Sequence, residues 1–273
     1  MPRRSAADSK KDRTGQILQE VLRSTFVSTT DLARQFGVST VAIRRNLAEL
    51  EQADLVKRVH GGVQAVARPG QIAQYNARLF EGITAKRAIG QAAARLIRPG
   101  DTLLLDSGTT VLEVARAIPA SLLENGNLTV VTRSLVIAGE LRLQRQVRLI
   151  VLGGIYVHDL DDFVGAQVEY GLQGLHVNTC FIGTDGFSVE RGITTDNVLE
   201  AQLYRLIARV ADQVVVVADS SKIGNQKLQT ILPFEEIHAL VTDTSAPTDF
   251  VQTLRDKGVN VVLAPTPDPE TCR

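Results

Sequence analysis

The chain has 273 residues, of which 44% are hydrophobic and 22% are charged, and its basic and acidic residues are equal in number. This length suits two domains, and this composition is ordinary for a soluble globular protein. No apolar run approaches the roughly 20 residues of a membrane-spanning helix, and the polar, basic start of the chain is not a secretory signal. Cys180 and Cys272 match no metal-ligand or redox spacing, so we expect no metal, no cofactor and a cytoplasmic location.

The neutral total hides an uneven distribution of charge. Residues 1–68 hold 12 Lys and Arg against 7 Asp and Glu, whereas residues 69–273 hold 18 against 23. A basic first part on an acidic second part favours a nucleic-acid partner for the first part alone. Taken by itself, a difference of this size is also within the ordinary scatter of charge along a chain.

The first domain is predicted to be helical at its start. Residues 1–9 are polar and unpatterned, which predicts a disordered arm before a domain at 10–66. Ile17, Leu18 and Val21 recur at helical spacing. A second helix follows from about residue 31, with Thr29 or Thr30 as its N-cap and Gly37 just past its end.

A third helix carries a single buried stripe. Ser39 is placed to cap this helix, and Ile43, Leu47 and Leu50 recur at spacings of four and three. Two strand-like runs then flank Gly61-Gly62, which predicts a hairpin. Two short helices, a reading helix and a hairpin together form a winged helix-turn-helix, with the helix-turn-helix motif at about 27–46.

The face of the third helix opposite its apolar stripe predicts DNA contacts. Thr40 and Arg44 lie near the helix N-terminus, from which such helices read bases in the major groove. Arginine can donate two hydrogen bonds to the O6 and N7 edge of guanine. In isolation, an Arg-Arg pair is more often a pair of solvated helix residues. The predicted DNA-binding residues, some for bases and the others for phosphates, are Ser39, Thr40, Arg44, Arg45, Lys57, Arg58 and His60.

The run from Thr29 to Glu51, followed by Arg58-Val-His-Gly-Gly, resembles the DeoR-type regulators of bacterial sugar metabolism. The resemblance implies a winged helix-turn-helix in this place. One departure is Asn46, where the family usually has Asp after Arg-Arg. Asn46 removes a negative charge that we expect beside the phosphates, so we expect altered affinity for DNA.

The second domain is predicted to be α/β. Residues 67–84, with Pro69 and Gly70, show weak periodicity and predict a linker. From 85 to 265, helical segments alternate with apolar strands, before a tail at 266–273. Such runs of Val, Ile and Leu predict a mostly parallel sheet that is buried on both faces. The predicted strands lie at 102–105, 128–131, 148–152, 179–183, 213–218, 238–242 and 259–263.

Polar residues follow several of these strands, at the edge where open α/β sheets bind ligands. Backbone N–H groups at a helix start, with Ser and Thr hydroxyls, suit a phosphate, and Lys222 would add a positive charge. Each residue has an alternative role as a helix cap or turn residue. The predicted effector-binding residues are Asp106, Ser107, Gly108, Thr109, Thr110, Thr132, Gly153, Gly154, Gly183, Asp185, Gly186, Glu200 and Lys222.

These motifs also match the DeoR-type C-terminal domain, so the resemblance covers residues 13–264. It implies a fold similar to ribose-5-phosphate isomerase and a phosphorylated sugar as effector. The stretch from Val189 to Leu203, with Asp219-Ser-Ser-Lys, looks closest to repressors of the N-acetylgalactosamine and galactitol pathways. Arg133 replaces a usual Asn, and it would reach an acidic ligand or change which sugar fits.

The likeness to an isomerase raises an enzyme as the alternative. Counting back by the isomerases' spacing places Tyr204 where their catalytic carboxylate lies, and a tyrosine is a poor base at neutral pH. Glu200 lies one turn earlier. A nucleotide-binding module is a third reading, but this sequence lacks the glycine-rich motifs of such modules. We therefore expect a non-enzymatic, oligomeric regulator, in the family's manner a repressor of a sugar or amino-sugar operon. Its partners would be operator DNA and a sugar phosphate, and we expect no association with a membrane.

Overall fold

The computed structural model describes residues 13–266, except for 19, 22–23, 25, 53–54, 66–72 and 159. The predicted arm and nearly all of the predicted tail lie outside the described residues. The chain divides into two compact units, and the main division falls between Thr84 and Ala85. No helix in the described ranges is long and apolar enough to span a bilayer.

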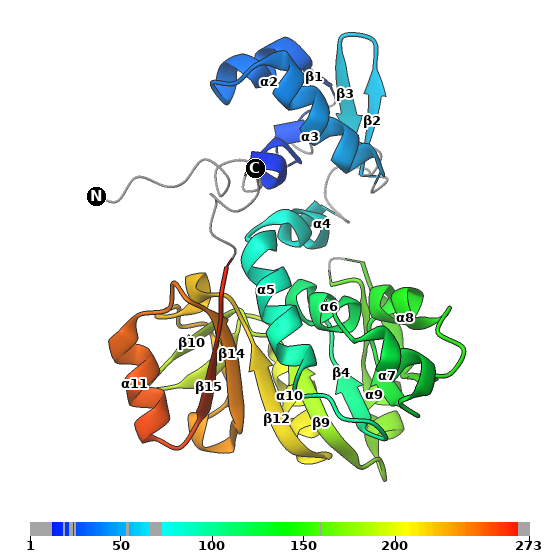
Figure 1. The fold of residues 1–273 in the computed structure, drawn as a ribbon, viewed down its shortest axis with the longest axis vertical. Helices are drawn as coiled ribbons and strands as arrows, with labels where there is room; N and C mark the ends of the chain where they lie inside the picture. The colour runs from blue at the N-terminus through cyan, green and yellow to red at the C-terminus, as the bar shows by residue number, and fades with distance from the viewer. Residues whose placement is uncertain are drawn as a thin grey trace. The chain divides into compact units, whose positions relative to one another are not determined.

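The first unit contains the predicted winged helix-turn-helix. Residues 13–18 and 20–21 are helical, and they are followed by α2 (Thr29–Gln35) and α3 (Thr40–Gln52). The strands β1 (Val27–Ser28), β2 (Val56–Val59) and β3 (Gly62–Ala65) form an antiparallel sheet in the order β1-β3-β2. Strands β2 and β3 are the two arms of the wing hairpin (Figure 1).

The apolar stripes predicted for the helices form one core. The cluster joins Ile17, Leu32, Ile43, Leu47 and Val63, all at most 1% exposed. The N-cap of α2 differs from the prediction of Thr29 or Thr30. Ser28 caps this helix because its Oγ accepts the N–H of Asp31 at 3.0 Å. Gly37 follows the helix with a φ of +63°, as predicted for a residue after a helix end.

The stretch predicted as a linker contains a helix. Helix α4 (Ala73–Phe80) lies within 67–84, and Tyr75 on it is buried. Phe80 packs against the core of the first unit, near Gly15. Pro69 and Gly70 at the start of this stretch favoured a linker, so this short helix was not predicted.

The second unit contains a seven-stranded, wholly parallel sheet. All its hydrogen-bonded neighbours pair in parallel, in the order β15-β14-β12-β9-β4-β5-β6. The seven predicted strands are therefore confirmed to within two residues at their ends. Their bounds are β4 (Thr102–Leu105), β5 (Thr129–Thr132), β6 (Arg148–Val151), β9 (Val177–Ile182), β12 (Ala211–Val217), β14 (Ala239–Asp243) and β15 (Asn260–Ala264).

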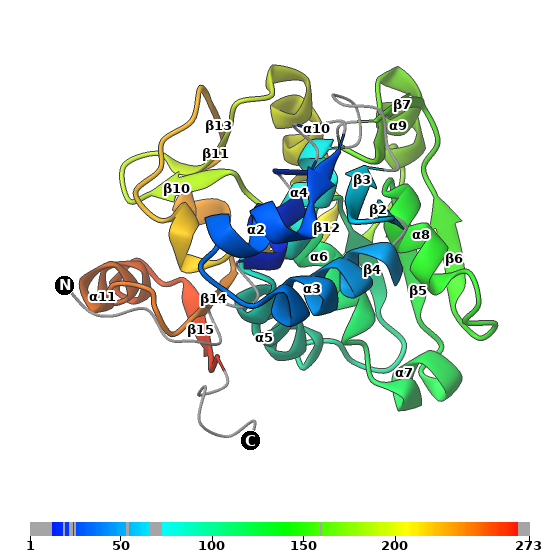
Figure 2. The same ribbon diagram turned by 90° about the horizontal axis from the view of Figure 1, so that it is seen from above.

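Helices cover both faces of this sheet. Helix α5 (Ile83–Ala94) and α7 (Ala120–Asn125) lie on one face, and α9 (Ala166–Leu172) and α10 (Val198–Arg209) lie on the other (Figures 1 and 2). Successive strand residues face opposite sides, so Cys180 and Val216 pack with Ile207 of α10. The remaining helices are α6 (Thr109–Arg116), α8 (Leu135–Leu141) and α11 (Thr248–Asp256).

Short strands that the sequence did not predict lie beside the main sheet. Strands β7 (Ile155–Val157) and β8 (Asp162–Val164) form an antiparallel pair. Strands β10 (Gly186–Ser188), β11 (Gly192–Thr195) and β13 (Gln229–Leu232) form a second small sheet. Two 3-10 turns, η1 (Ser220–Lys222) and η2 (Phe234–Glu236), complete the described elements of this unit.

The strand order reverses beside β4. From β4 the chain proceeds through β5 to β6 on one side, and then through β9, β12, β14 and β15 on the other. Loops that leave β4 and β9 therefore run to opposite sides of the sheet, which is the position where open α/β sheets bind ligands. Ser107, after β4, and Gly183, after β9, lie beside each other at this edge of the sheet.

Candidate DNA-reading surface and effector site

The start of α3 carries the predicted DNA-reading residues on its exposed side. Ser39 caps the helix, since its Oγ accepts the N–H of Ala42 at 3.2 Å. Ile43 and Leu47 are buried and fix the rotation of the helix. Arg44 and Arg45 are exposed, and Thr40 is half-buried. Both arginines are thus accessible on the side opposite the core, where the sequence predicts contacts to bases and phosphates.

The wing presents three further basic side chains. Lys57 and Arg58 are exposed on β2, and His60 is exposed in the turn before β3. Arg58 is held by Glu51 of α3: its Nε lies 2.5 Å from Oε2 and its backbone N–H donates to Oε1 at 3.0 Å. These hydrogen bonds lower the pKa of the Glu51 carboxyl. The prediction that Arg58 binds phosphate therefore requires it to act while paired with Glu51.

Asn46 lies in the core and not beside the phosphates, which corrects our expectation for this departure from the family pattern. It is fully buried, and its Nδ2 donates to Thr14 Oγ1 at 2.6 Å. Its Oδ1 accepts from Arg13 Nε at 3.3 Å. Asn46 therefore ties α3 to the first helix of the domain, and any effect on DNA affinity would act through the placement of α3.

The predicted effector residues follow the carboxyl ends of neighbouring parallel strands. Asp106, Ser107 and Gly108 follow β4 and lead into α6, which begins at Thr109. Gly108 has a φ of +110°, a conformation that favours glycine, and it turns the chain into the helix. Thr132 ends β5, Gly183 and Asp185 follow β9, and Lys222 lies in η1 after β12.

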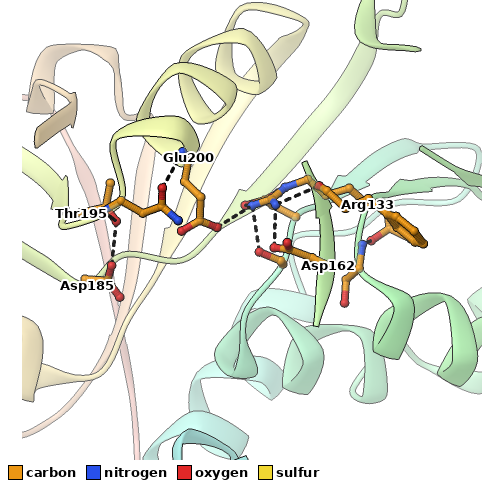
Figure 3. A network of polar contacts seen from close by, with 11 residues as sticks. Arg133, Asp162, Asp185, Thr195 and Glu200 are labelled. Carbon is orange, nitrogen blue, oxygen red and sulfur yellow. Dashed lines mark hydrogen bonds and ion pairs between the residues drawn. The ribbon is translucent and has the colours of Figure 1, made fainter. Parts of the chain in front are cut away.

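Arg133 is the centre of the polar network at these strand ends (Figure 3). Its side chain is 1% exposed, and its Nε and Nη2 donate to the two carboxylate oxygens of Asp106 at 2.5 and 3.3 Å. Nη1 donates to Asp162 Oδ2 at 2.6 Å, and Nη2 also donates to Glu200 Oε1 at 3.2 Å and Ser107 Oγ at 2.9 Å. The Tyr204 ring centroid lies 5.6 Å from the guanidinium carbon. The guanidinium is thus occupied by the protein's own groups, which corrects the first alternative, that it would reach an acidic ligand. The second alternative, that Arg133 changes which sugar fits, stays a prediction.

Three buried carboxylates surround this one guanidinium, so ionised carboxylates would outnumber the positive charge. Burial raises the pKa of Glu200 to about 7, opposed by Arg133 and reinforced by Asp162 and Asp106. Burial likewise raises the pKa of Asp162 to about 6, again opposed by Arg133. Burial lowers the pKa of Arg133, but Asp106 and Asp162 raise it well above its ordinary value. The guanidinium stays charged, while the carboxyl groups of Asp162 and Glu200 hold protons more readily than in water.

A chain of hydrogen bonds links this network to the loop after β9. Glu200 N–H donates to Asn197 Oδ1 at 3.3 Å, and Asn197 N–H donates to Thr195 Oγ1 at 3.1 Å. Thr195 Oγ1 in turn donates to Asp185 Oδ2 at 2.8 Å. As Figure 3 shows, Asp185, Thr195 and Glu200 lie in sequence toward Arg133. Residues that follow β4, β5 and β9 and residues of β8, β11 and α10 are therefore joined in one polar assembly.

The other predicted effector residues are not joined to this assembly by hydrogen bonds within the described chain. Gly153 and Gly154 are exposed after β6, and Gly186 is buried at the start of β10. Thr132 Oγ1 accepts the N–H of Ser134 at 3.1 Å, which is a local turn contact. Lys222 is half-buried and forms no ion pair with the described residues.

Sequence reasoning missed Asp162 altogether. Asp162 begins β8, and it is fully buried although it follows another aspartate in a polar stretch. Its Oδ1 is buried without a hydrogen-bond partner among the described residues. The unusual arginine at 133 was the one available signal, since a buried arginine needs carboxylate partners.

Solved structures with a related arrangement are distant in sequence. Ribose 5-phosphate isomerase A from Neisseria gonorrhoeae matches with a TM-score of 0.38 and 13% identity, over 57% of each chain. A probable sor operon regulator from Shigella flexneri matches with a TM-score of 0.38 and 12% identity, over 65% of this chain and 88% of that one. A likeness of this size does not bear on function.

Sequence comparisons identify both units. Residues 13–68 match the DeoR-like helix-turn-helix domain, and residues 81–244 match the DeoR C terminal sensor domain. The chain is 34% identical over 254 residues to the "Putative aga operon transcriptional repressor" of Escherichia coli O157:H7, covering 92% of this chain and 93% of that one. It is 33% identical to the regulator GlpR of Haloferax volcanii, covering 92% and 96%, and 29% identical to GolR of Listeria innocua, covering 93% and 98%. These relatives are named as regulators, and their names do not support the alternative that the chain is an enzyme. The chain belongs to the DeoR family of DNA-binding transcriptional regulators.

Proposed function

We propose that this protein represses a sugar or amino-sugar catabolic operon, and that a phosphorylated sugar lowers its affinity for the operator. The proposal that the protein binds an effector is supported by the polar assembly at the strand ends beside β4. Asp106, Asp185 and Glu200 come from separate segments and meet where open parallel sheets bind ligands. The aga operon named for the Escherichia coli relative supports a sugar-related operon.

On the DNA side, α3 enters the major groove. Arg44 donates to a guanine edge, and Thr40 contacts a neighbouring base. Ser39, Arg45, Lys57, Arg58 and His60 contact phosphates and set the register of the domain on the duplex. The exposure of Arg44, Arg45 and Lys57 supports these roles. The protein binds as a homo-oligomer, in which two reading helices meet two half-sites.

On the effector side, the phosphate binds near the start of α6. The backbone N–H groups after Gly108 and the hydroxyls of Thr109 and Thr110 donate to it, while Lys222 supplies a positive charge. Asp185 is the carboxylate of the polar assembly that is only half-buried, and it accepts hydrogen bonds from sugar hydroxyls. The effector shifts the protein toward a poorly DNA-binding arrangement because it has different affinities for the two states.

Arg44→Ala is expected to weaken operator binding by about 5- to 150-fold, the worth of one bidentate base contact of about 1–3 kcal/mol. The measurement is fluorescence anisotropy with the duplex that wild type prefers. Arg142→Ala, which removes an exposed arginine of the second unit, is the matched control. Wild-type affinity in Arg44→Ala would mean that α3 is not the reading helix.

Lys222→Ala is expected to bind the operator like wild type. Its release from the operator should require a sugar phosphate concentration about tenfold higher than for wild type, or more. The lost ammonium group removes attraction for the phosphate alone, so DNA binding without effector stays unchanged. Lys257→Ala controls for charge, because Lys257 lies in α11's C-cap and pairs with Glu235. A normal effector response in Lys222→Ala would place the phosphate elsewhere.

A further inference from the structure

An apolar side chain stands on the exposed side of the reading helix. Val41 is the second residue of α3, and 71% of its surface is exposed. Ile43, Leu47 and Leu50 are buried at 0–1% exposure, so the rotation of the helix is fixed. Val41, Arg44 and Arg45 stand at the i, i+3 and i+4 positions of one helical face. Val41 is therefore a neighbour of both exposed arginines.

Single exposed apolar residues are common on proteins and need no special explanation. The position of Val41 distinguishes it from the others. It lies in the first turn of α3, from which a helix-turn-helix protein reads base edges. Of its neighbours in that turn, Ser39 is engaged in capping the helix, and Thr40 and Ala42 are half-buried. Val41 is thus the first-turn side chain that is most available to the groove.

The chemistry of valine restricts what it can recognise. Its two methyl groups neither donate nor accept hydrogen bonds, so they cannot select the polar edges of guanine, cytosine or adenine. The C5 methyl of thymine is the apolar group that the major groove presents, and apolar side chains contact it. A valine beside Arg44 therefore suits a thymine next to the base that Arg44 reads.

We propose that Val41 is a specificity-determining residue that packs on the C5 methyl of a thymine in each operator half-site. This inference rests on the proposed DNA-reading role of α3. The contact buries one methyl group of DNA, and burial of a group of that size is worth about a fourfold difference in affinity. Its loss leaves the phosphate contacts intact, so overall binding persists and only the preference at one base changes.

The test begins with the duplex that the full-length wild-type protein selects from a random pool. Each thymine is then replaced in turn by deoxyuridine, which removes the methyl group and leaves every hydrogen-bonding edge unchanged. For wild type, we expect about a fourfold loss of affinity at one thymine per half-site. Val41→Ala should bind the thymine and deoxyuridine duplexes equally at that position, because the partner of the methyl group is gone.

Leu143→Ala is the matched control, since Leu143 is 72% exposed in the second unit, and it should keep the wild-type response to deoxyuridine. A wild type that is indifferent to every deoxyuridine would overturn the inference, as would Val41→Ala retaining the full methyl effect. A half-site without thymine would overturn it too. If wild type selected no sequence at all, the proposed DNA-reading function itself would fail, which separates the two claims.

Discussion

Replacing Arg133 by methionine is expected to destabilise the second unit by about 3–5 kcal/mol, because breaking a buried ion pair leaves uncompensated charge. Asp106, Asp162 and Glu200 are at most 5% exposed, and each accepts a hydrogen bond from this guanidinium. Without it, three carboxylates share a desolvated space with no counter-charge. Urea unfolding at neutral pH, followed by circular dichroism, measures the loss.

Arg116→Met is the control for Arg133→Met. Arg116 also pairs with two glutamates, but its side chain is 43% exposed, and its buried partner Glu113 keeps an ion pair with Arg87, so its removal should cost about 0–1 kcal/mol. The loss of stability in Arg133→Met should be smaller near pH 5, because the carboxylates left without a counter-charge take up protons there. A variant within about 1 kcal/mol of wild type at neutral pH would contradict the role of Arg133 as the counter-charge.

As the pH rises from about 5 to about 8, the stability of Glu200→Gln is expected to increase by about 2–3 kcal/mol relative to that of wild type. Folding raises the pKa of Glu200 from its usual 4.5 to about 7. The folded protein therefore holds this proton more tightly than the unfolded chain, and wild-type stability falls as pH rises through that window. Glutamine keeps the shape of the side chain and does not titrate.

Urea unfolding at a series of pH values checks this prediction, with the difference between variant and wild type as the quantity that matters. Glu124→Gln removes an exposed carboxylate from α7 and serves as the control. Parallel stability curves for wild type and Glu200→Gln would show that Glu200 is ionised throughout the window. A difference that changes only below about pH 5, where wild type would lose stability relative to the variant, would show that Arg133 outweighs burial in setting the pKa of Glu200.

The large sheet could be predicted because a strand that is buried on both faces must be a continuous apolar run. Val214 to Val217 and Leu103 to Leu105 are such runs, and both are strands of the parallel sheet. The short strands β8 and β10 escaped prediction because three residues carry no period, and their pairing depends on neighbours far along the chain.

The candidate sites were predictable to different degrees. The reading face of α3 follows from a local period, because Ile43, Leu47 and Leu50 fix which side is buried. The surroundings of Arg133 do not follow from any local pattern. Its partners Asp106, Asp162 and Glu200 lie 27, 29 and 67 residues away along the chain. Only the folded sheet brings them together, so the burial of Arg133 among carboxylates could not be predicted from the sequence.

The central claim is that one protein joins operator binding to the sensing of a sugar phosphate. Its most direct test is an anisotropy titration of the full-length protein on its selected duplex, repeated with a panel of hexose, pentose and amino-sugar phosphates. We predict salt-sensitive, sequence-selective binding that one phosphate releases and its unphosphorylated sugar does not. Selective binding that no member of the panel changes would contradict the sensing of a sugar phosphate, and turnover of a sugar phosphate without selective DNA binding would contradict the whole account.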